Sequence, residues 1–217
     1  MDIEKARFNM VEQQIRPWDV LDQRVLDLLF QVRREEYVPP IYRTLAFVDM
    51  EIPLGHGEVM MSPKMEARIV QELALKKTDN VLEVGTGSGY LTALLAHQAL
   101  HVYSVEIAPE FKMQAEQKVK AHGITNVTLD VGDAARGWGR HGPYDVIVLT
   151  GSTPVLPDAF LTSLKPGGRL FAIVGDAPVM EARLVTCVTP GVFNTVKLFE
   201  TSIAPLNNAV QPERFVF

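Results

Sequence analysis

Three glycines stand at alternate positions in the middle of the chain, Gly85, Gly87 and Gly89. They follow residues 81–84, a short apolar run with two valines that is typical of a buried strand. Residues 91–97, which come next, are predicted to be helical. Strand, glycine turn and helix are typical of a nucleotide-binding turn, because glycine lets the backbone turn sharply and approach a ligand closely. The spacing is G-x-G-x-G, whereas the dinucleotide fingerprint is G-x-G-x-x-G, so NAD-linked oxidoreduction is disfavoured.

Three carboxylates accompany this turn. Glu83 lies inside the motif, where a negative charge repels a pyrophosphate but suits a ligand with a cationic amine. Glu106 ends the next predicted strand, about 20 residues after the turn, where a carboxylate can accept hydrogen bonds from both ribose hydroxyls. Asp133 follows the third predicted strand and can accept from an exocyclic adenine amine. Each alone also reads as an ordinary acid at a strand end, but together they predict an adenosine ligand with a free 2′-hydroxyl.

The segment 47–65 is rich in both glycine and hydrophobic residues, which is unusual for a simple connector. Ser62 followed by Pro63 predicts a helix start, with the serine as N-cap and the proline at the first helical position. The functional interpretation is that this loop covers the cofactor and forms one wall of the acceptor pocket. The alternatives are that Ser62 is only a cap, that Met61 fills the core, and that His56 is a loop histidine without a catalytic role.

The remaining pattern predicts an α/β fold with a doubly wound, mostly parallel sheet, because strands alternate with helices. We expect an N-terminal helical extension over residues 1–46 and a cofactor-binding α/β domain over residues 47–217, forming one globular unit. An antiparallel hairpin is predicted near the end of the chain. The predicted helices are 2–15, 22–32, 109–121 and 157–164, and the predicted strands are 81–84, 101–105, 126–131, 144–149, 169–174, 182–188 and 192–199. Residues 33–36 are interpreted as a solvated helix end.

The composition limits the class of protein. The chain has 217 residues, 47% of them hydrophobic, and a net charge of −5, which suits one globular domain and argues against nonspecific nucleic-acid binding. No apolar run approaches the roughly 20 residues of a membrane span, and no metal site is predicted. The single cysteine, Cys187, is expected to be a packed core thiol and fits a reducing cytoplasm. Residues 215–217 are expected to pack either on this chain or against a partner, and the oligomeric state is left open.

In these motifs taken together, the chain resembles the protein-L-isoaspartate O-methyltransferase family, over about residues 20–175. The glycine motif and the two acids after it are common to many methyltransferases that use S-adenosylmethionine (SAM), whereas the loop with Gly55, His56 and Gly57 before Pro63 is more specific. The resemblance implies a methyl transfer from SAM, leaving S-adenosylhomocysteine, to the α-carboxyl of isoaspartyl residues in damaged proteins. The matching segments are 36–39, 52–57, 62–65, 81–90, 102–106, 132–133 and 164–170.

The chain departs from the family pattern in the acceptor loop. The family loop usually reads glycine, glutamine, threonine, isoleucine, serine, any residue, proline. Aligned on Pro63, the family threonine falls on Val59 and the functional serine falls on Met61, while Ser62 lies one position late. The usual aromatic residue or histidine after the proline is Lys64, which either attracts an acceptor carboxylate or is a solvated first-turn residue. Two alternatives therefore stay open: methyl transfer to a different acceptor, and a SAM-binding protein that has lost catalysis.

The motifs and the resemblance together assign two groups of residues. The expected acceptor-side residues are His56, Met61, Ser62 and Lys64. The expected cofactor-binding residues are Glu83, Gly85, Thr86, Gly87, Ser88, Gly89, Glu106, Ile107, Gly132, Asp133 and Ala134.

Overall fold

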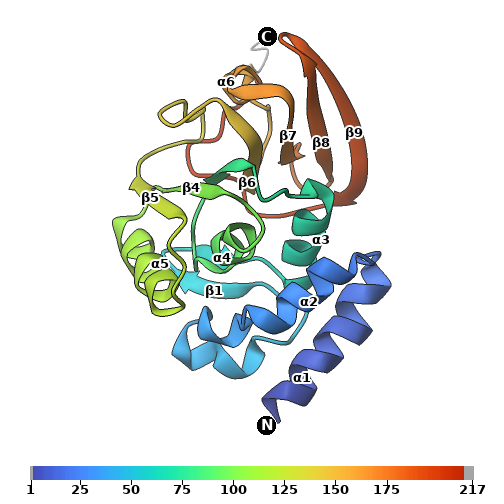
Figure 1. Cartoon of the computed structure of the whole chain (residues 1–217), viewed down its shortest axis with the longest axis vertical. Coiled ribbons are helices and arrows are strands. Elements are labelled where there is room, and N and C mark those ends of the chain that lie inside the picture. Colours follow the sequence, from blue (N-terminus) through green and yellow to red (C-terminus); the bar gives the residue numbers. More distant parts are fainter. Residues whose placement is uncertain (1, 213–217) are drawn as a thin grey trace.

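The centre of the molecule is a seven-stranded sheet with the strand order β5-β4-β3-β6-β7-β8-β9 (Figure 1). A computed structural model describes residues 2–212. Strands β3 to β7 run parallel to one another, and β8 and β9 extend the sheet in antiparallel directions. The strands are β3 (Asn80–Val84), β4 (His101–Glu106), β5 (Val127–Val131), β6 (Tyr144–Thr153), β7 (Leu164–Val174), β8 (Met180–Thr189) and β9 (Val192–Thr201). The predicted α/β fold with an antiparallel C-terminal hairpin is confirmed.

Apolar residues alternate between the two faces of the sheet. Val81 and Val146 belong to one buried cluster and Leu82 and Ile147 to another, so both faces are covered, as parallel sheets require. The chain builds outward from β3 through β4 and β5 and then returns to the other side of β3 at β6. That reversal opens a crevice beyond the carboxyl ends of these strands. The helices that connect the strands are α4 (Tyr90–Ala96), α5 (Pro109–Ala121) and α6 (Asp158–Thr162).

The N-terminal segment is helical, as predicted, and it shares the core of the domain. α1 (Ile3–Met10) continues as a π-helix, Val11–Ile15, and a short 3-10 helix, Arg16–Trp18; α2 (Gln23–Gln31) follows. Asp22 caps α2 by accepting a hydrogen bond from the Arg24 backbone N–H at 2.9 Å. Buried side chains of both helices belong to the same apolar cluster as those of α3 (Pro63–Leu73) and α4. The domain boundary at residue 46 stays a prediction.

The interpretation of residues 33–36 as a solvated helix end is wrong for two side chains. Arg34 and Glu35, in the 3-10 helix Arg34–Glu36, are buried. Each meets an opposite charge that its own sequence neighbourhood does not reveal, since Arg34 pairs with Glu66 of α3 and Glu35 pairs with Arg7 of α1. Charged side chains are buried in proteins when they are paired in this way.

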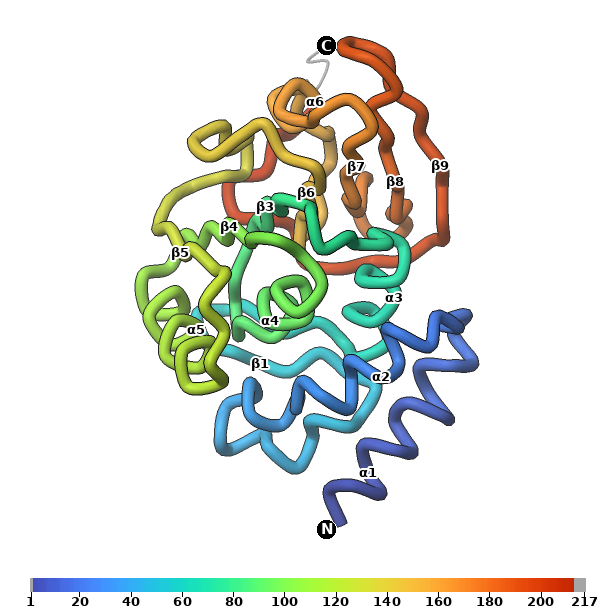
Figure 2. The backbone as a smooth tube through the Cα atoms, viewed as in Figure 1, coloured from blue at the N-terminus to red at the C-terminus, as the bar shows by residue number. Residues whose placement is uncertain are grey.

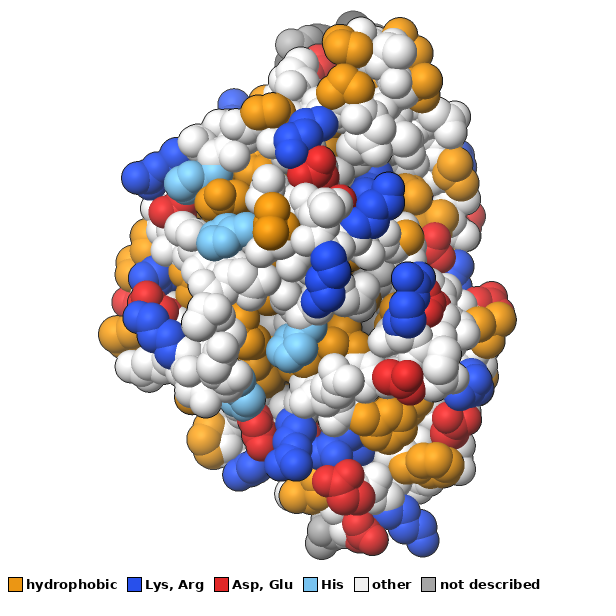
Figure 3. Space-filling view, in the orientation of Figure 1, with side chains coloured by type: hydrophobic (Ala, Val, Ile, Leu, Met, Phe, Trp, Pro, Cys, Tyr) orange, Lys and Arg blue, Asp and Glu red, His pale blue; other side chains and the backbone are white. Residues whose placement is uncertain are grey.

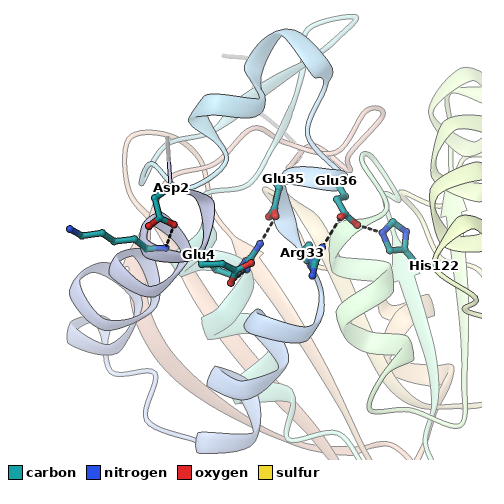
Figure 4. Close-up of polar contacts among 8 residues, drawn as sticks. Asp2, Glu4, Arg33, Glu35, Glu36 and His122 are labelled. Atoms are coloured by element: carbon teal, nitrogen blue, oxygen red, sulfur yellow. Dashed lines mark hydrogen bonds and ion pairs between the residues drawn. The ribbon is translucent and has the colours of Figure 1, made fainter.

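Glu36 follows these buried residues in the sequence and is more exposed (Figure 4). Glu36 points toward His122, at the end of α5, and also lies 3.7 Å from Arg33. The His122 ring stacks on Tyr37, with 5.1 Å between ring centroids. These contacts join α5 to the N-terminal segment beside the glycine turn.

The segment predicted as a loop contains a small hairpin. β1 (Ile52–Gly55) pairs with β2 (Glu58–Met60) in antiparallel fashion, after a 3-10 helix, Pro40–Leu45. His56 and Gly57 connect the two strands and have φ angles of 54° and 84°. Two consecutive positive φ angles match the twist of a tight hairpin. The sequence signal is weak because the usual residue pairs in a tight hairpin are Asn-Gly and Asp-Gly, whereas this chain has His-Gly.

A segment after β9 runs back across the molecule toward β6 (Figure 2). We call residues 202–209 the strap. The Ser152 N–H donates to the carbonyl of Ala204 at 3.0 Å, and the Leu206 N–H donates to the carbonyl of Ser152 at 2.9 Å. The backbone of the strap is therefore hydrogen-bonded to the carboxyl end of β6, and no sequence motif announces it.

Acidic, basic and apolar side chains are interspersed over the face shown in Figure 3. Within residues 2–212, every helix is too short or too polar to span a bilayer. Cys187 is a buried free thiol in β8, which confirms its prediction as a packed core residue. The expectation for residues 215–217 lies outside the described residues.

Candidate active site

The glycine turn connects β3 to α4 through backbone that side chains disfavour. Gly85 has a φ of 95°, and a Cβ built there would lie 2.2 Å from Thr150 Oγ1. The Gly85 N–H donates to the carbonyl of Val105 at 2.8 Å, which holds the turn against the end of β4. Gly89 has a φ of 81° at the start of α4, and a Cβ there would lie 3.0 Å from the Cβ of Ala115 in α5. The first glycine thus opens space beside β6, and the last lets two helices pack closely.

Glu106 ends β4 and its carboxylate organises the turn. Oε2 accepts a hydrogen bond from the Gly87 N–H at 2.8 Å, and Oε1 accepts one from the Ala108 N–H at 3.0 Å. The side chain is buried except where it lines a cavity above the sheet. Each carboxylate oxygen can accept more than one hydrogen bond, so Glu106 can also accept from a ligand with a diol.

Asp133 lies after β5, at the mouth of the same cavity, and is exposed. Oδ1 accepts from the Ala135 N–H at 3.0 Å, and Oδ2 accepts from Asn208 Nδ2 of the strap at 2.9 Å. The Asn208 group is an amide NH₂, the same kind of donor as an exocyclic adenine amine. The carboxylate is therefore oriented to receive an amine donor.

Glu83 lies behind the turn and does not line the cavity. It is fully buried, and its Oε2 accepts hydrogen bonds from the hydroxyls of Thr92 and Ser104. Its Oε1 has no hydrogen-bond partner within residues 2–212. Burial raises the pKa of Glu83 to about 8, more than the two hydroxyls lower it. The Glu83 carboxyl therefore links α4 to β4 behind the turn. Its direct contact with a cofactor stays a prediction.

One cavity brings together the predicted cofactor residues, and we call it the cofactor cavity. All of them except Glu83 and Gly89 line it. Its walls are Glu51, Leu54, Glu58, Val59, Met60, Met61, Glu66, Val84, Gly85, Thr86, Gly87, Ser88, Leu91, Val105, Glu106, Ile107, Phe111, Gly132, Asp133, Ala134, Ala135, Thr150, Gly151 and residues 203–207. The left-handed glycines and the two strand-end carboxylates provide a fitting site for an adenosine ligand.

Three of the four predicted acceptor-side residues lie at two adjoining cavities, and Met61 lines both of them. This side chain lines the cofactor cavity and also a second, adjoining cavity, which Ser62 and Lys64 line. Lys64 Nζ lies 2.7 Å from Asp49 Oδ2 and 5.1 Å from the centre of the Trp18 ring. Ser62 occupies the N-cap position of α3, as predicted, but its hydroxyl makes no capping hydrogen bond.

His56 lines neither cavity and packs edge-on against Phe111, with ring centroids 5.6 Å apart. It belongs to the hairpin turn described above. The placement supports a role in holding the hairpin beside α5.

Two groups of cavity residues were not anticipated from the sequence. The first is a set of glutamates, Glu51, Glu58 and Glu66, which with Glu106 and Asp133 surround the cavity with carboxylates. Such a lining favours a cationic ligand. The second is the strap, whose Asn207 Nδ2 lies 2.9 Å from Glu58 Oε1. Glu51 and Glu58 carry a faint signal, because they lie in the segment that forms the hairpin. Glu66, in α3, and the strap carry none.

Within residues 2–212, no group of three or more His, Cys, Asp or Glu side chains is arranged to hold a metal ion. Among the described residues that line the two cavities, Lys64 is the only one with a basic side chain. The geometry therefore joins a cavity suited to a cationic adenosine ligand to a second cavity that is lined by one lysine, Lys64, and one glutamate, Glu51.

Comparison with known proteins places this arrangement in a family. A protein-L-isoaspartate O-methyltransferase of Gloeobacter violaceus is 36% identical over 197 residues, which cover 91% of this chain and 96% of that protein. One of Vibrio parahaemolyticus is 40% identical, covering 76% of this chain and 79% of that protein.

Solved structures show the same fold. A protein-L-isoaspartate O-methyltransferase matches 94% of this chain and 66% of its own, with a TM-score of 0.77 and 24% identity. A second such structure, described as putative, from Plasmodium falciparum in complex with S-adenosyl-L-homocysteine, has a TM-score of 0.75 and 20% identity and covers 92% of this chain and 97% of its own. The family model for protein-L-isoaspartate (D-aspartate) O-methyltransferase matches residues 5–196, and the chain therefore belongs to that family of methyltransferases.

Proposed function

We propose that this protein transfers a methyl group from SAM to the carboxylate of isoaspartyl residues in damaged proteins. The observation that carries the proposal is the meeting of the cofactor residues and the acceptor loop at one cavity. Family membership supports the same reaction. A reducing cytoplasm as the place of action, and the absence of nucleic acid among its partners, stay predictions.

The residues of the cofactor cavity suit this reaction. When bound, SAM supplies a methyl group on a sulfonium, so that a C–O bond forms to the acceptor as the C–S bond breaks and its electron pair stays on sulfur. In this site Glu106 would accept hydrogen bonds from the ribose hydroxyls, and Asp133 would accept one from the adenine amine. The surrounding carboxylates complement the positive charge of the ligand. The turn residues Thr86 and Ser88 and the flanking Ile107, Gly132 and Ala134 form the remaining walls.

The acceptor side needs to position a carboxylate and to exclude water. An acceptor carboxylate is ionised at pH 7 and needs no strong general base, so alignment with the methyl group supplies most of the catalysis. Lys64 attracts this carboxylate in exchange for Asp49, and Ser62 offers a hydroxyl at the same cavity. Met61, with Val59, excludes water from the cofactor cavity.

The test pairs SAM calorimetry with methyl transfer to an isoaspartyl peptide and to its normal aspartyl counterpart. We expect SAM binding in the calorimeter, and turnover only with the isoaspartyl peptide. Binding without turnover on any isoaspartyl peptide, while a competent relative works in the same assay, would contradict the proposed acceptor.

One observation favours a second candidate, methyl transfer to another acceptor. Val59, Met60 and Met61 give this stretch of the cavity wall no hydroxyl, whereas the family pattern places a threonine and a serine there. A screen of small-molecule and protein carboxylates decides between the two. Isoaspartyl peptide as the best acceptor excludes the second candidate.

Removal of the Asp133 carboxylate is expected to weaken SAM binding by about 1–3 kcal/mol, the scale of one lost hydrogen bond with its partner left unsatisfied. Asp133→Ala and wild type are compared by calorimetry. Asn208→Ala is the matched control, because it removes the strap contact to Asp133 and leaves the carboxylate in place. Equal SAM affinity for Asp133→Ala and wild type would remove Asp133 from the site.

A further inference from the structure

Arg34 is a buried cation that touches three separate parts of the chain. It is 1% exposed. Its Nε donates to the carbonyl of Ala46 at 2.9 Å, and its Nη2 donates to the carbonyl of Met61 at 2.7 Å. Its Nη1 donates to the carboxylate of Glu66 in α3. The guanidinium also lies 5.3 Å from the centre of the Tyr90 ring in α4.

Two of these contacts lie in the wall of the active site. Met61 and Glu66 both line the cofactor cavity, and Met61 also lines the second cavity. Met61 lies between β2 and α3, outside the hydrogen-bond pattern of either element. The orientation of its carbonyl is therefore set by a side-chain donor rather than by secondary structure, and that donor is Arg34.

A planar guanidinium suits this position better than any other cation. It directs several N–H groups at fixed angles and remains charged when buried. A lysine ammonium carries its charge on a flexible stem and cannot reproduce three divergent contacts at once. The chain thus fixes the backbone of the acceptor loop from the N-terminal segment, through a side chain that itself lines neither cavity.

We propose that Arg34 is a positioning residue for methyl transfer, which holds the Met61 backbone and the Glu66 carboxylate at the cavity wall. The inference rests on the proposed function for its effect on turnover. When the three contacts are lost, we expect the loop to become more mobile. We also expect kcat/KM for the acceptor to fall more than the affinity for SAM.

The alternative is a buried ion pair that only stabilises the fold. Arg7 provides the matched control, because it is equally buried in the same N-terminal segment, pairs with Glu35 and lies 5.8 Å from the Phe47 ring centre. Figure 4 shows the Glu35 carboxylate, which accepts a hydrogen bond from Arg7. Arg7 lines neither cavity. A purely structural role predicts that Arg34→Lys and Arg7→Lys behave alike.

The experiment compares Arg34→Lys and Arg7→Lys in the full chain. Each variant is assayed at the same temperature interval below its own midpoint of thermal unfolding. For Arg34→Lys we expect at least a tenfold loss in kcat/KM for isoaspartyl peptide, with a raised KM and a SAM Kd within threefold of wild type. For Arg7→Lys we expect kcat/KM, KM and the SAM Kd all to stay within twofold of the wild-type values. Equal kinetic losses in both variants would overturn the proposal.

Hydrogen exchange of the backbone amides of residues 56–62 gives a readout that needs no turnover. These amides should exchange at least tenfold faster in Arg34→Lys than in Arg7→Lys, and equal exchange would overturn the proposal. If wild type transfers no methyl group to isoaspartyl peptide, the proposed function fails while the exchange data still decide the role of Arg34. Should Arg34→Lys not fold, Glu66→Gln replaces it, with a severalfold faster exchange expected in the same segment and unchanged exchange counting against the proposal.

Discussion

Gly85→Ala is expected to destabilise the fold by about 2–5 kcal/mol, the sum of a left-handed backbone penalty and of overpacking. The new Cβ would lie 2.2 Å from Thr150 Oγ1, at a φ of 95°. Thr150 cannot easily retreat, because its Oγ1 donates to the carbonyls of Val84 and Gly85 at 2.8 and 2.9 Å. Urea unfolding measures the loss, and SAM calorimetry on the remaining folded protein should show weaker binding.

Gly123→Ala is the matched control for this prediction. Gly123 also has a positive φ, of 69°, but a Cβ there would meet nothing within 4 Å. We expect a loss of only about 1–2 kcal/mol, from the backbone alone. If the two variants unfold at the same urea concentration, the contact with Thr150 does not constrain the turn.

Glu83→Gln is expected to change the pH dependence of stability. The folded protein holds the proton of Glu83 up to a pKa of about 8, raised by burial, whereas the unfolded chain releases it near 4.5. Wild type therefore loses stability from this group as the pH rises from about 4.5 to 8, and the loss is constant above that range. Gln mimics the protonated acid, so the free energy of unfolding of the variant relative to wild type should rise by on the order of 4 kcal/mol across this range.

Denaturant unfolding of both proteins at several pH values between 4.5 and 8.5 measures this difference. Glu181→Gln is the control, because the Glu181 side chain is only partly buried and its pKa is lowered, mainly by the hydrogen bond from Lys197 and then by that from Arg183. Its carboxylate is ionised in both states above pH 5, so its stability difference should stay constant there. Parallel curves for wild type and Glu83→Gln would show that Glu83 is charged in the folded protein.

The elements governed by local pattern were predictable from the sequence. The valine-rich run before Gly85 forms the central strand β3, and Glu106 and Asp133 do lie at the ends of successive strands around one cavity. Each of these depends on hydrophobic periodicity or on the chain direction in a parallel sheet. Both are properties that a short stretch of sequence contains.

The features that were missed depend on partners far away in the chain. Arg34 and Glu35 look like part of a solvated charge run until Glu66 and Arg7 are brought beside them. Glu83 lies in the right motif, yet the pleat of β3 directs it below the turn, toward Thr92 and Ser104. No periodicity describes such pairings, because they arise only when separate elements pack.

The strap builds one wall of the cofactor cavity from residues that follow the whole sheet in the sequence. Every strand of the sheet precedes residues 203–207 in the chain, yet these residues form one wall of the cavity and Asn207 and Asn208 contact Glu58 and Asp133 across it. A chain whose strap is detached would therefore keep the pairing of its seven strands and lose one wall of the cofactor cavity.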